Sequence, residues 1–257
     1  MNKISPALLV FVLLAAAGFA ADMPLVAEWR KKAEAGEAKF QELMGECYAD
    51  AYSSFGVPQD FAEAAKWYRL AAEQGYGMAQ NNLGLMYDKG EGVPQDYAEA
   101  VKWWRKAAEQ GNALAQGYLG FMYEKGNGVP IDSAEAVKWY RLAAEQGDAM
   151  GQNNLGFMYE IGTGVPKDKA EAVKWYRKAA DQGLALAQCN LGRMYGTGEG
   201  VPKDLVQAHV WYNIARANRD EIAKYNLAIV EKQMTSDQKA EAMKLARDLF
   251  AKLPKGN

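Results

Sequence analysis

Residues 79–114 read AQNNLGLMYDKGEGVPQDYAEAVKWWRKAAEQGNAL, and this stretch decides how the rest of the chain is organised. Three of its residues recur every 36 positions: the tryptophan at Trp67, Trp103, Trp139, Trp175 and Trp211, the proline at Pro58, Pro94, Pro130, Pro166 and Pro202, and the aspartate at Asp60, Asp96, Asp132, Asp168 and Asp204. A fixed period of this length is typical of stacked supersecondary repeats, not of one closed globule. A residue that fills the same place in every repeat builds the scaffold, so we expect function where the repeats differ.

The first half of the repeat predicts an amphipathic helix. Ala79, Leu83 and Met86 fall on one stripe, at spacings of three and four residues. Gly84 lies within this helix, where glycine costs about 0.8–1 kcal/mol relative to alanine. The glycine recurs as Gly120, Gly156 and Gly192. We therefore expect a neighbouring helix to approach closely at this position.

The second half predicts a turn and a second helix. Glycines and Pro94 end the first helix and prevent its continuation. Asp96 and Glu99 then have the spacing of a capping box, in which the aspartate accepts from early backbone N–H groups and the glutamate reaches back. Ala100, Trp103 and neighbouring alanines give the second helix its apolar face. The repeat is thus a helix hairpin, and hairpins must stack to bury their stripes.

Leu-Gly-x-x-Tyr followed by a paired-helix pattern resembles a tetratricopeptide repeat. The Gly-x-Gly-Val-Pro-x-Asp turn, with Glu-Ala-x-Lys-Trp-Tyr-Arg-x-Ala-Ala after it, resembles the Sel-one-like repeat family over about residues 38–252. This resemblance implies an all-α fold, a right-handed α-α superhelix (solenoid) of stacked 36-residue helix hairpins. It also implies a role in binding other proteins, as an adaptor or assembly factor.

We divide the chain into a signal peptide (1–20), a leading segment with a short helix (21–37), the repeats (38–234) and a C-terminal capping helix with a tail (235–257). The expected repeats are about 38–78, 79–114, 115–150, 151–186 and 187–222, with a partial repeat at 223–234. Thr235 and Gln238 have the spacing of a capping box at the start of the last helix.

The first residues predict export. Lys3 precedes an apolar run from Ala7 to Ala17, and Gly18 and Ala20 fit the small residues of a signal-peptidase site. The alternative is an uncleaved membrane anchor, which needs roughly 20 apolar residues. The run is shorter than that, so we expect a periplasmic or secreted protein that is not attached to the membrane after cleavage.

The composition and the cysteines narrow the possible partners and bonds. A formal net charge of −2 over 257 residues gives no strong field to attract nucleic acid. Cys47 and Cys189 lie nearly four repeats apart, whereas a disulfide needs Cα atoms within roughly 7 Å. We expect buried free thiols, with an intermolecular bridge through Cys189 as the alternative.

We expect no catalytic, cofactor-binding or metal-binding residue. The only histidine, His209, aligns with Val101, Val137 and Val173, which favours packing over catalysis. One histidine and two separated cysteines do not supply the usual zinc ligands. The alternative is a hydrolase of cell-wall material or β-lactams, because secreted, cysteine-rich relatives of the resembled family have been described as β-lactamase-like. Those relatives carry paired cysteines in each repeat, which this chain lacks.

The first helices vary on the face that we expect opposite the packing stripe. Three aligned positions vary there: Asn81, Gly117, Asn153, Cys189 and Tyr225; Leu85, Phe121, Phe157, Arg193 and Ile229; and Asp88, Glu124, Glu160, Gly196 and Lys232. Our hypothesis is an apolar ribbon of Leu85, Phe121 and Phe157 on a concave surface, edged by Asp88, Glu124 and Glu160 and continued by Arg193.

This ribbon would bind a protein or peptide segment, and its acidic edge would favour a basic partner. The alternative is that Phe121 and Phe157 pack between adjacent first helices and meet no ligand. A bound glycan in place of a protein, and weak self-association through the end repeats, also stay open.

Overall fold

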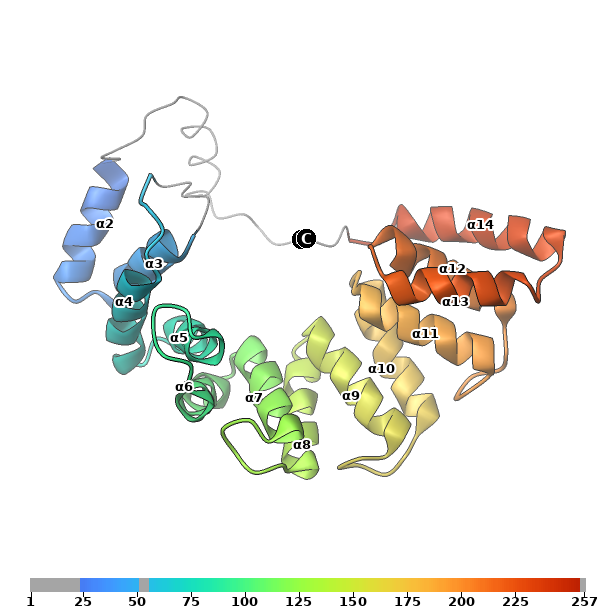
Figure 1. The fold of residues 1–257 in the computed structure, drawn as a ribbon, viewed down its shortest axis with the longest axis horizontal. Helices are drawn as coiled ribbons and strands as arrows, with labels where there is room; N and C mark the ends of the chain where they lie inside the picture. Colours follow the sequence, from blue (N-terminus) through green and yellow to red (C-terminus); the bar gives the residue numbers. More distant parts are fainter. Residues whose placement is uncertain (1–23, 51–55, 255–257) are drawn as a thin grey trace. The chain divides into compact units, whose positions relative to one another are not determined.

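The computed structural model describes residues 24–50 and 56–254, and these are helical with short connections (Figure 1). The expected all-α solenoid of paired helices is confirmed. The helices of the described residues are α2 (Pro24–Glu34), α3 (Ala38–Ala49), α4 (Phe61–Glu73), α5 (Gly77–Lys89), α6 (Tyr97–Glu109), α7 (Ala113–Lys125), α8 (Ser133–Glu145), α9 (Ala149–Ile161), α10 (Lys169–Asp181), α11 (Ala185–Thr197), α12 (Leu205–Ala217), α13 (Glu221–Glu231) and α14 (Ser236–Phe250). The predicted signal peptide lies outside the described residues.

The chain forms two compact units. The N-terminal unit comprises Met1–Ala115 and Gly126–Pro130, and the C-terminal unit comprises Gln116–Lys125 and Ile131–Asn257. In the N-terminal unit each helix from α2 to α6 packs on the next. In the C-terminal unit α8 to α13 pack in the same consecutive way, and α14 packs on α12.

An aspartate begins each second helix. In α8, Asp132 Oδ1 accepts hydrogen bonds of 3.0 Å from the backbone N–H groups two and three residues on. The return bond that the capping box predicts is not made here by the equivalent glutamate, Glu135. The backbone N–H of Asp132 instead donates to the Tyr123 carbonyl at 3.0 Å, and Glu135 pairs with Lys138 at 3.2 Å. Contact with the preceding helix has therefore replaced half of the capping box.

The recurring glycine of the first helices marks a close approach, as expected, and the group that approaches is an aromatic ring. A Cβ atom on Gly120 would lie 2.7 Å from Cδ1 of Tyr140, which is too close for a real contact. Only glycine lets α8 lie this near to α7. The same contact joins Gly156 to Tyr176 and Gly192 to Tyr212 in the C-terminal unit, and Gly84 to Trp104 in the N-terminal unit.

The glycine pair of each turn connects one repeat to the repeat before it. Gly162 ends α9 in the left-handed region, with φ of 77°. Gly164, with φ of 71°, lies where a Cβ would be 2.1 Å from the carbonyl oxygen of Ser133, at the start of α8. The turn after α9 therefore rests directly on the preceding second helix. This contact accounts for the Gly-x-Gly pattern.

A row of glutamines, which sequence reasoning missed, links helices across repeats. The buried Gln152 of α9 donates through Nε2 to the Ala144 carbonyl at the end of α8, at 3.1 Å. Its Oε1 accepts from Gln182, the C-cap of α10, at 2.8 Å. One amide thus bonds three successive helices. Gln80 with Gln110, and Gln188 with Asn218, repeat the arrangement.

The last helix has both halves of its predicted capping box. Thr235 Oγ1 accepts from the Gln238 backbone N–H at 3.2 Å, and Gln238 Oε1 accepts from the Thr235 N–H at 2.9 Å. Ala242 and Ala246 are the buried residues of α14, which packs on α12. The helix therefore covers the end of the stack with one narrow face.

The capping difference gives a first prediction. Asp132→Ala should lower the free energy of unfolding by about 1 kcal/mol, because two backbone N–H groups lose their acceptor. Glu135→Gln should change it by less than about 0.5 kcal/mol, because this side chain makes only an exposed ion pair. Urea unfolding followed by circular dichroism measures both. Equal losses of unfolding free energy in the two variants would show that Glu135 does complete a reciprocal capping box.

The glycine contact gives a second prediction, with a control in the same helix. Gly120→Ala should destabilise the protein by about 1–3 kcal/mol through overpacking against Tyr140. Gly117→Ala should be neutral or stabilising by up to about 1 kcal/mol, since its nearest neighbour would be Asp148 Oδ2 at 3.6 Å. Thermal and urea unfolding would show the difference. A stabilised Gly120→Ala variant would contradict the close contact.

Candidate functional site

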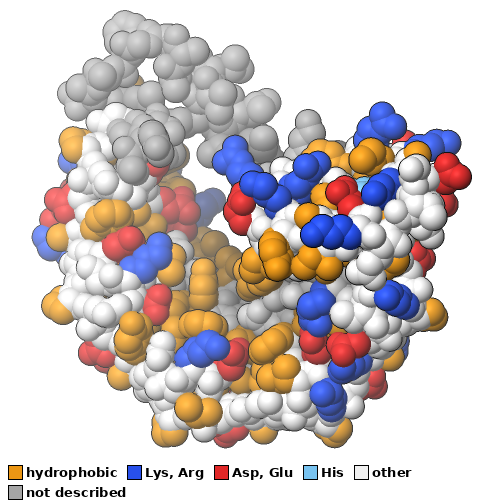
Figure 2. All heavy atoms as spheres, turned by 45° about the vertical axis from the view of Figure 1, so that its right-hand side comes forward, with side chains coloured by type: hydrophobic (Ala, Val, Ile, Leu, Met, Phe, Trp, Pro, Cys, Tyr) orange, Lys and Arg blue, Asp and Glu red, His pale blue; other side chains and the backbone are white. Residues whose placement is uncertain are grey.

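The predicted aromatic positions of the first helices lie at the surface of the C-terminal unit. Phe121 of α7 is 40% exposed and Phe157 of α9 is 42% exposed. Arg193 of α11 follows at the same position and is half-buried. Figure 2 shows exposed hydrophobic side chains among charged ones over this unit. Both rings thus retain apolar surface that a partner would bury.

Tyrosine hydroxyls hold the neighbouring glutamates. Tyr140 of α8 donates to Glu124 Oε2 at 2.8 Å, and Tyr176 of α10 donates to Glu160 Oε2 at 2.8 Å. Arg193 also donates to Glu160 Oε2, at 2.5 Å. These are the same tyrosines whose rings lie on the helix glycines. The glycine contact therefore places each hydroxyl one turn along the first helix, at its glutamate.

Burial raises the pKa of the Tyr140 and Tyr176 hydroxyls, and the adjacent glutamates raise it further. Both hydroxyls therefore stay protonated and remain donors at neutral pH. The Glu160 carboxylate contacts the Tyr176 hydroxyl and the Arg193 guanidinium. The Glu124 carboxylate contacts the Tyr140 hydroxyl and, at 2.5 Å, the Lys125 ammonium group. The predicted acidic edge consequently presents less free charge to a basic partner than the sequence suggested.

The N-terminal unit has a different local arrangement. Trp104 replaces the tyrosine, and its Nε1 donates to the Asn81 carbonyl at 3.2 Å. Asp88 therefore has no tyrosine hydroxyl on this helix pair, and burial raises its pKa against the opposing effect of Lys89. Leu85 is half-buried. That Leu85 and Asp88 continue the row of Phe121 and Phe157 stays a prediction.

One of the three varying positions is interior in three of the five repeats, where its predicted place opposite the packing stripe is wrong; Tyr225, at the same position in the last repeat, is 70% exposed. Asn81, Asn153 and Cys189 are all buried. Asn153 Oδ1 accepts from Asn190 at 3.0 Å, which links α9 to α11. First helices contact more than one neighbour, so a wider arc of their surface is covered than one stripe.

Both cysteines are buried free thiols, as expected. Burial raises the pKa of Cys189 to about 12, and the nearby Asp220 carboxylate adds to the shift. Burial likewise raises the pKa of Cys47 to about 12. Neither sulfur is a reactive thiolate at neutral pH.

Sequence reasoning also missed a second exposed row. Met150, Leu186 and Ile222 lie at the starts of α9, α11 and α13 and are exposed. These positions recur every 36 residues. Because we assumed that recurring positions build the scaffold, we did not consider them as a binding surface. A recurring apolar residue on the exposed side of the helix would have indicated this row.

The single histidine is enclosed, as its alignment with valines predicted. His209 is fully buried in α12. Its Nδ1 accepts from the Asn213 amide at 2.9 Å, so Nε2 carries the proton and donates to Glu231 Oε1 at 3.2 Å. Among residues 24–50 and 56–254, no cluster of three His, Cys, Asp or Glu side chains is placed to hold a metal ion. No helix in these ranges has the length and apolarity to cross a membrane.

A family model described as the Sel1 repeat matches residues 38–76, 77–112, 113–148, 149–184 and 185–220. The chain belongs to the Sel1 repeat family. Solenoids of this family generally act as non-catalytic scaffolds for protein interaction. A comparison of the sequence with curated proteins found no match.

Solved structures agree with this assignment. The chain is 42% identical to c5321, a protective antigen of uropathogenic Escherichia coli strains with an SLR fold. The two structures superpose with a TM-score of 0.77, and the match covers 88% of this chain and 48% of c5321. The chain thus spans about half the length of that relative. It is 35% identical to a Sel1 repeat protein from Oxalobacter formigenes, at a TM-score of 0.72, covering 82% and 85%. Immunity protein Pa5087 from Pseudomonas aeruginosa shares the fold alone, with 21% identity, a TM-score of 0.51 and coverage of 87% and 84%.

The enclosed histidine of this Sel1 repeat protein gives a third prediction. Burial lowers the pKa of His209 below its ordinary value of 6.5, and Glu231 only partly offsets this. The unfolded chain therefore binds more protons below that pH, and the free energy of unfolding should fall as the pH drops below about 6.5. His209→Val, which restores the residue of the aligned repeats, should make this decline shallower.

Urea unfolding of both proteins from about pH 5 to about pH 8 measures the effect. The carboxylates titrate in both proteins, so the difference between the two curves isolates the histidine. Parallel curves would show that the imidazole titrates alike in the folded and unfolded chains.

Proposed function

We propose that this Sel1 repeat protein is an exported, non-catalytic adaptor or assembly scaffold that binds a protein or peptide segment on its first helices. The observation that carries the proposal is the pair of exposed phenylalanines, Phe121 and Phe157, one repeat apart on rigid helices of the C-terminal unit. Aromatic anchors with unburied surface are the usual energetic centres of protein interfaces.

The surroundings of the two rings support a preformed binding surface. Glu124 and Glu160 lie one turn beyond the rings and are fixed by tyrosine hydroxyls. Arg193 is fixed by Glu160. A partner would thus lose little side-chain entropy at these polar contacts and bury apolar area at the rings. An extended or helical segment matches a row with one anchor in each repeat.

Export is the second part of the proposal. Lys3, the apolar run that follows and the small residues Gly18 and Ala20 have the composition of a cleaved leader. The E. coli relative is described as a protective antigen, which supports an exported location for this chain. The absence of catalysis rests on the enclosed His209 and on the two buried thiols, which supply no accessible base or nucleophile.

Replacement of both anchors tests the binding surface. Phe121→Ser with Phe157→Ser should lower recovery of a partner at least tenfold, since anchors of this kind contribute about 2 kcal/mol or more. Chemical crosslinking in the exported fraction, followed by affinity capture and mass spectrometry, measures recovery. The unfolding transition should remain cooperative, because both rings are already partly in water.

The matched control is Met150→Ser with Leu186→Ser, which removes two equally exposed apolar side chains from the helix starts. This control should retain the partner. If only the control loses the partner, the binding site is the row of Met150, Leu186 and Ile222. Unfolding of the phenylalanine variant would make the rings core residues and end the proposal. Labelling of the chain by a covalent active-site probe would overturn its non-catalytic part.

A further inference from the structure

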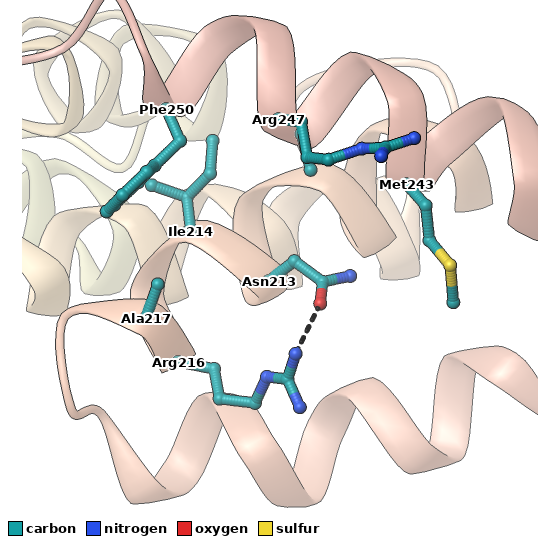
Figure 3. A pocket seen from close by; sticks show the side chains of 8 residues that line it. Asn213, Ile214, Arg216, Ala217, Met243, Arg247 and Phe250 are labelled. Carbon is teal, nitrogen blue, oxygen red and sulfur yellow. Dashed lines mark hydrogen bonds between the residues drawn. The ribbon is translucent and has the colours of Figure 1, made fainter.

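A cavity lies between α12 and α14 in the C-terminal unit (Figure 3). Its volume is about 440 Å³, and it is lined by Asn213, Ile214, Arg216, Ala217, Met243, Ala246, Arg247 and Phe250. Ile214 and Ala246 are buried, whereas Met243 and Phe250 are exposed. The cavity therefore has an apolar floor and an accessible mouth, and its size suits a small ligand.

The charge of the cavity has one sign. Arg216 and Arg247 contribute guanidinium groups from two different helices, and no carboxylate belongs to the lining. Arg216 donates to Asn213 Oδ1 at 3.1 Å, which the dashed line in Figure 3 marks. Within the described ranges, neither arginine forms an ion pair. Two cations thus border apolar surface without a partner anion.

The last repeat departs from the others along the α12 wall of this cavity. Arg216 stands where the preceding repeats have an alanine, at Ala72, Ala108, Ala144 and Ala180. Ala217 stands where they have an acid, at Glu73, Glu109, Glu145 and Asp181. The last repeat has therefore gained a cation and lost an anion at adjacent positions. Its facing wall, α14, follows the five matched repeats.

We propose that this cavity binds a small carboxylic acid that carries an apolar acyl or aryl tail. The carboxylate would bind the Arg216 guanidinium, because charge-assisted bonds from guanidinium to carboxylate are strong and directional, and Arg247 would add favourable charge from the other wall. The tail would lie over the buried Ile214 and remove apolar surface of Met243 and Phe250 from water. The inference is independent of the row of Phe121 and Phe157.

A free acid fits the lining better than the C-terminal residue of a peptide. A peptide would bring a backbone N–H into the cavity, and that group needs an acceptor. The only side-chain oxygen in the lining is Asn213 Oδ1, and Arg216 already takes one of its two acceptor positions. An acyl tail has no such requirement.

Calorimetric titration of the full chain with sodium octanoate tests the proposal. We expect saturable binding at one site, and about tenfold weaker binding in Arg216→Ala, which removes a cation, and in Ala217→Glu, which adds a carboxylate that repels the ligand. Both variants install residues that the preceding repeats carry, so folding should be preserved, and unfolding midpoints would verify this. Lys244→Ala, an exposed cation of α14 outside the lining, should bind within about twofold of the parent.

Three results would overturn the proposal. They are absence of saturable octanoate binding, binding that Ala217→Glu leaves unchanged, and octylamine binding as tightly as octanoate. An N-acetylated dipeptide ending in leucine separates the two sources of the carboxylate. If this dipeptide binds more tightly than octanoate, the ligand of the cavity is the C-terminus of a peptide and not a free acid.

Discussion

The contact between a glycine in the first helix and an aromatic ring in the second helix is the constraint on which each hairpin depends. At Gly120 the Tyr140 ring occupies the space that any side chain would need. This depth of approach fixes how far the ring reaches, and so it also fixes the hydroxyl on Glu124. A packing requirement thereby positions a polar group at the surface, next to the exposed Phe121. Scaffold and candidate binding face are consequently products of one contact.

Departures from the repeat leave this contact in place. Where Trp104 replaces tyrosine, the glycine contact is kept, but Asp88 lies in a half-buried setting that raises its pKa. Where the last second helix carries Arg216 and Ala217, the helix still packs, and a cationic cavity opens beside it. Neither change disturbs the stack. The repeats can therefore differ in chemistry at positions that the common contacts leave unused.

The sequence predicted the features that follow from local rules. The stride, the helix pairs, the aspartate caps and the cap of α14 depend on neighbouring residues alone. Tertiary competition decided the rest: Tyr123 takes the N–H that Glu135 was expected to satisfy, and Asn190 of α11 bonds Asn153, so that position is buried. The surface positions of Phe121 and Phe157 were expected, whereas the anchoring of their glutamates was not. The packing of α14 on α12 does not follow from the 36-residue repeat, so the sequence pattern could not predict the cavity between them.

The glutamine row has a consequence for the history of the protein. Gln152 completes its hydrogen bonds within its own repeat and the one before it. Duplication or loss of a whole 36-residue block by recombination therefore rejoins equivalent amides, and no buried amide is stranded at the junction. Extra residues between the two helices of a repeat also leave the bond intact, since Gln74 donates to Gln41 at 2.7 Å across 33 positions, where Gln182 and Gln152 are 30 apart. Array length can thus evolve freely in whole blocks, which permits relatives as different in length as the E. coli antigen, of which this chain spans 48%.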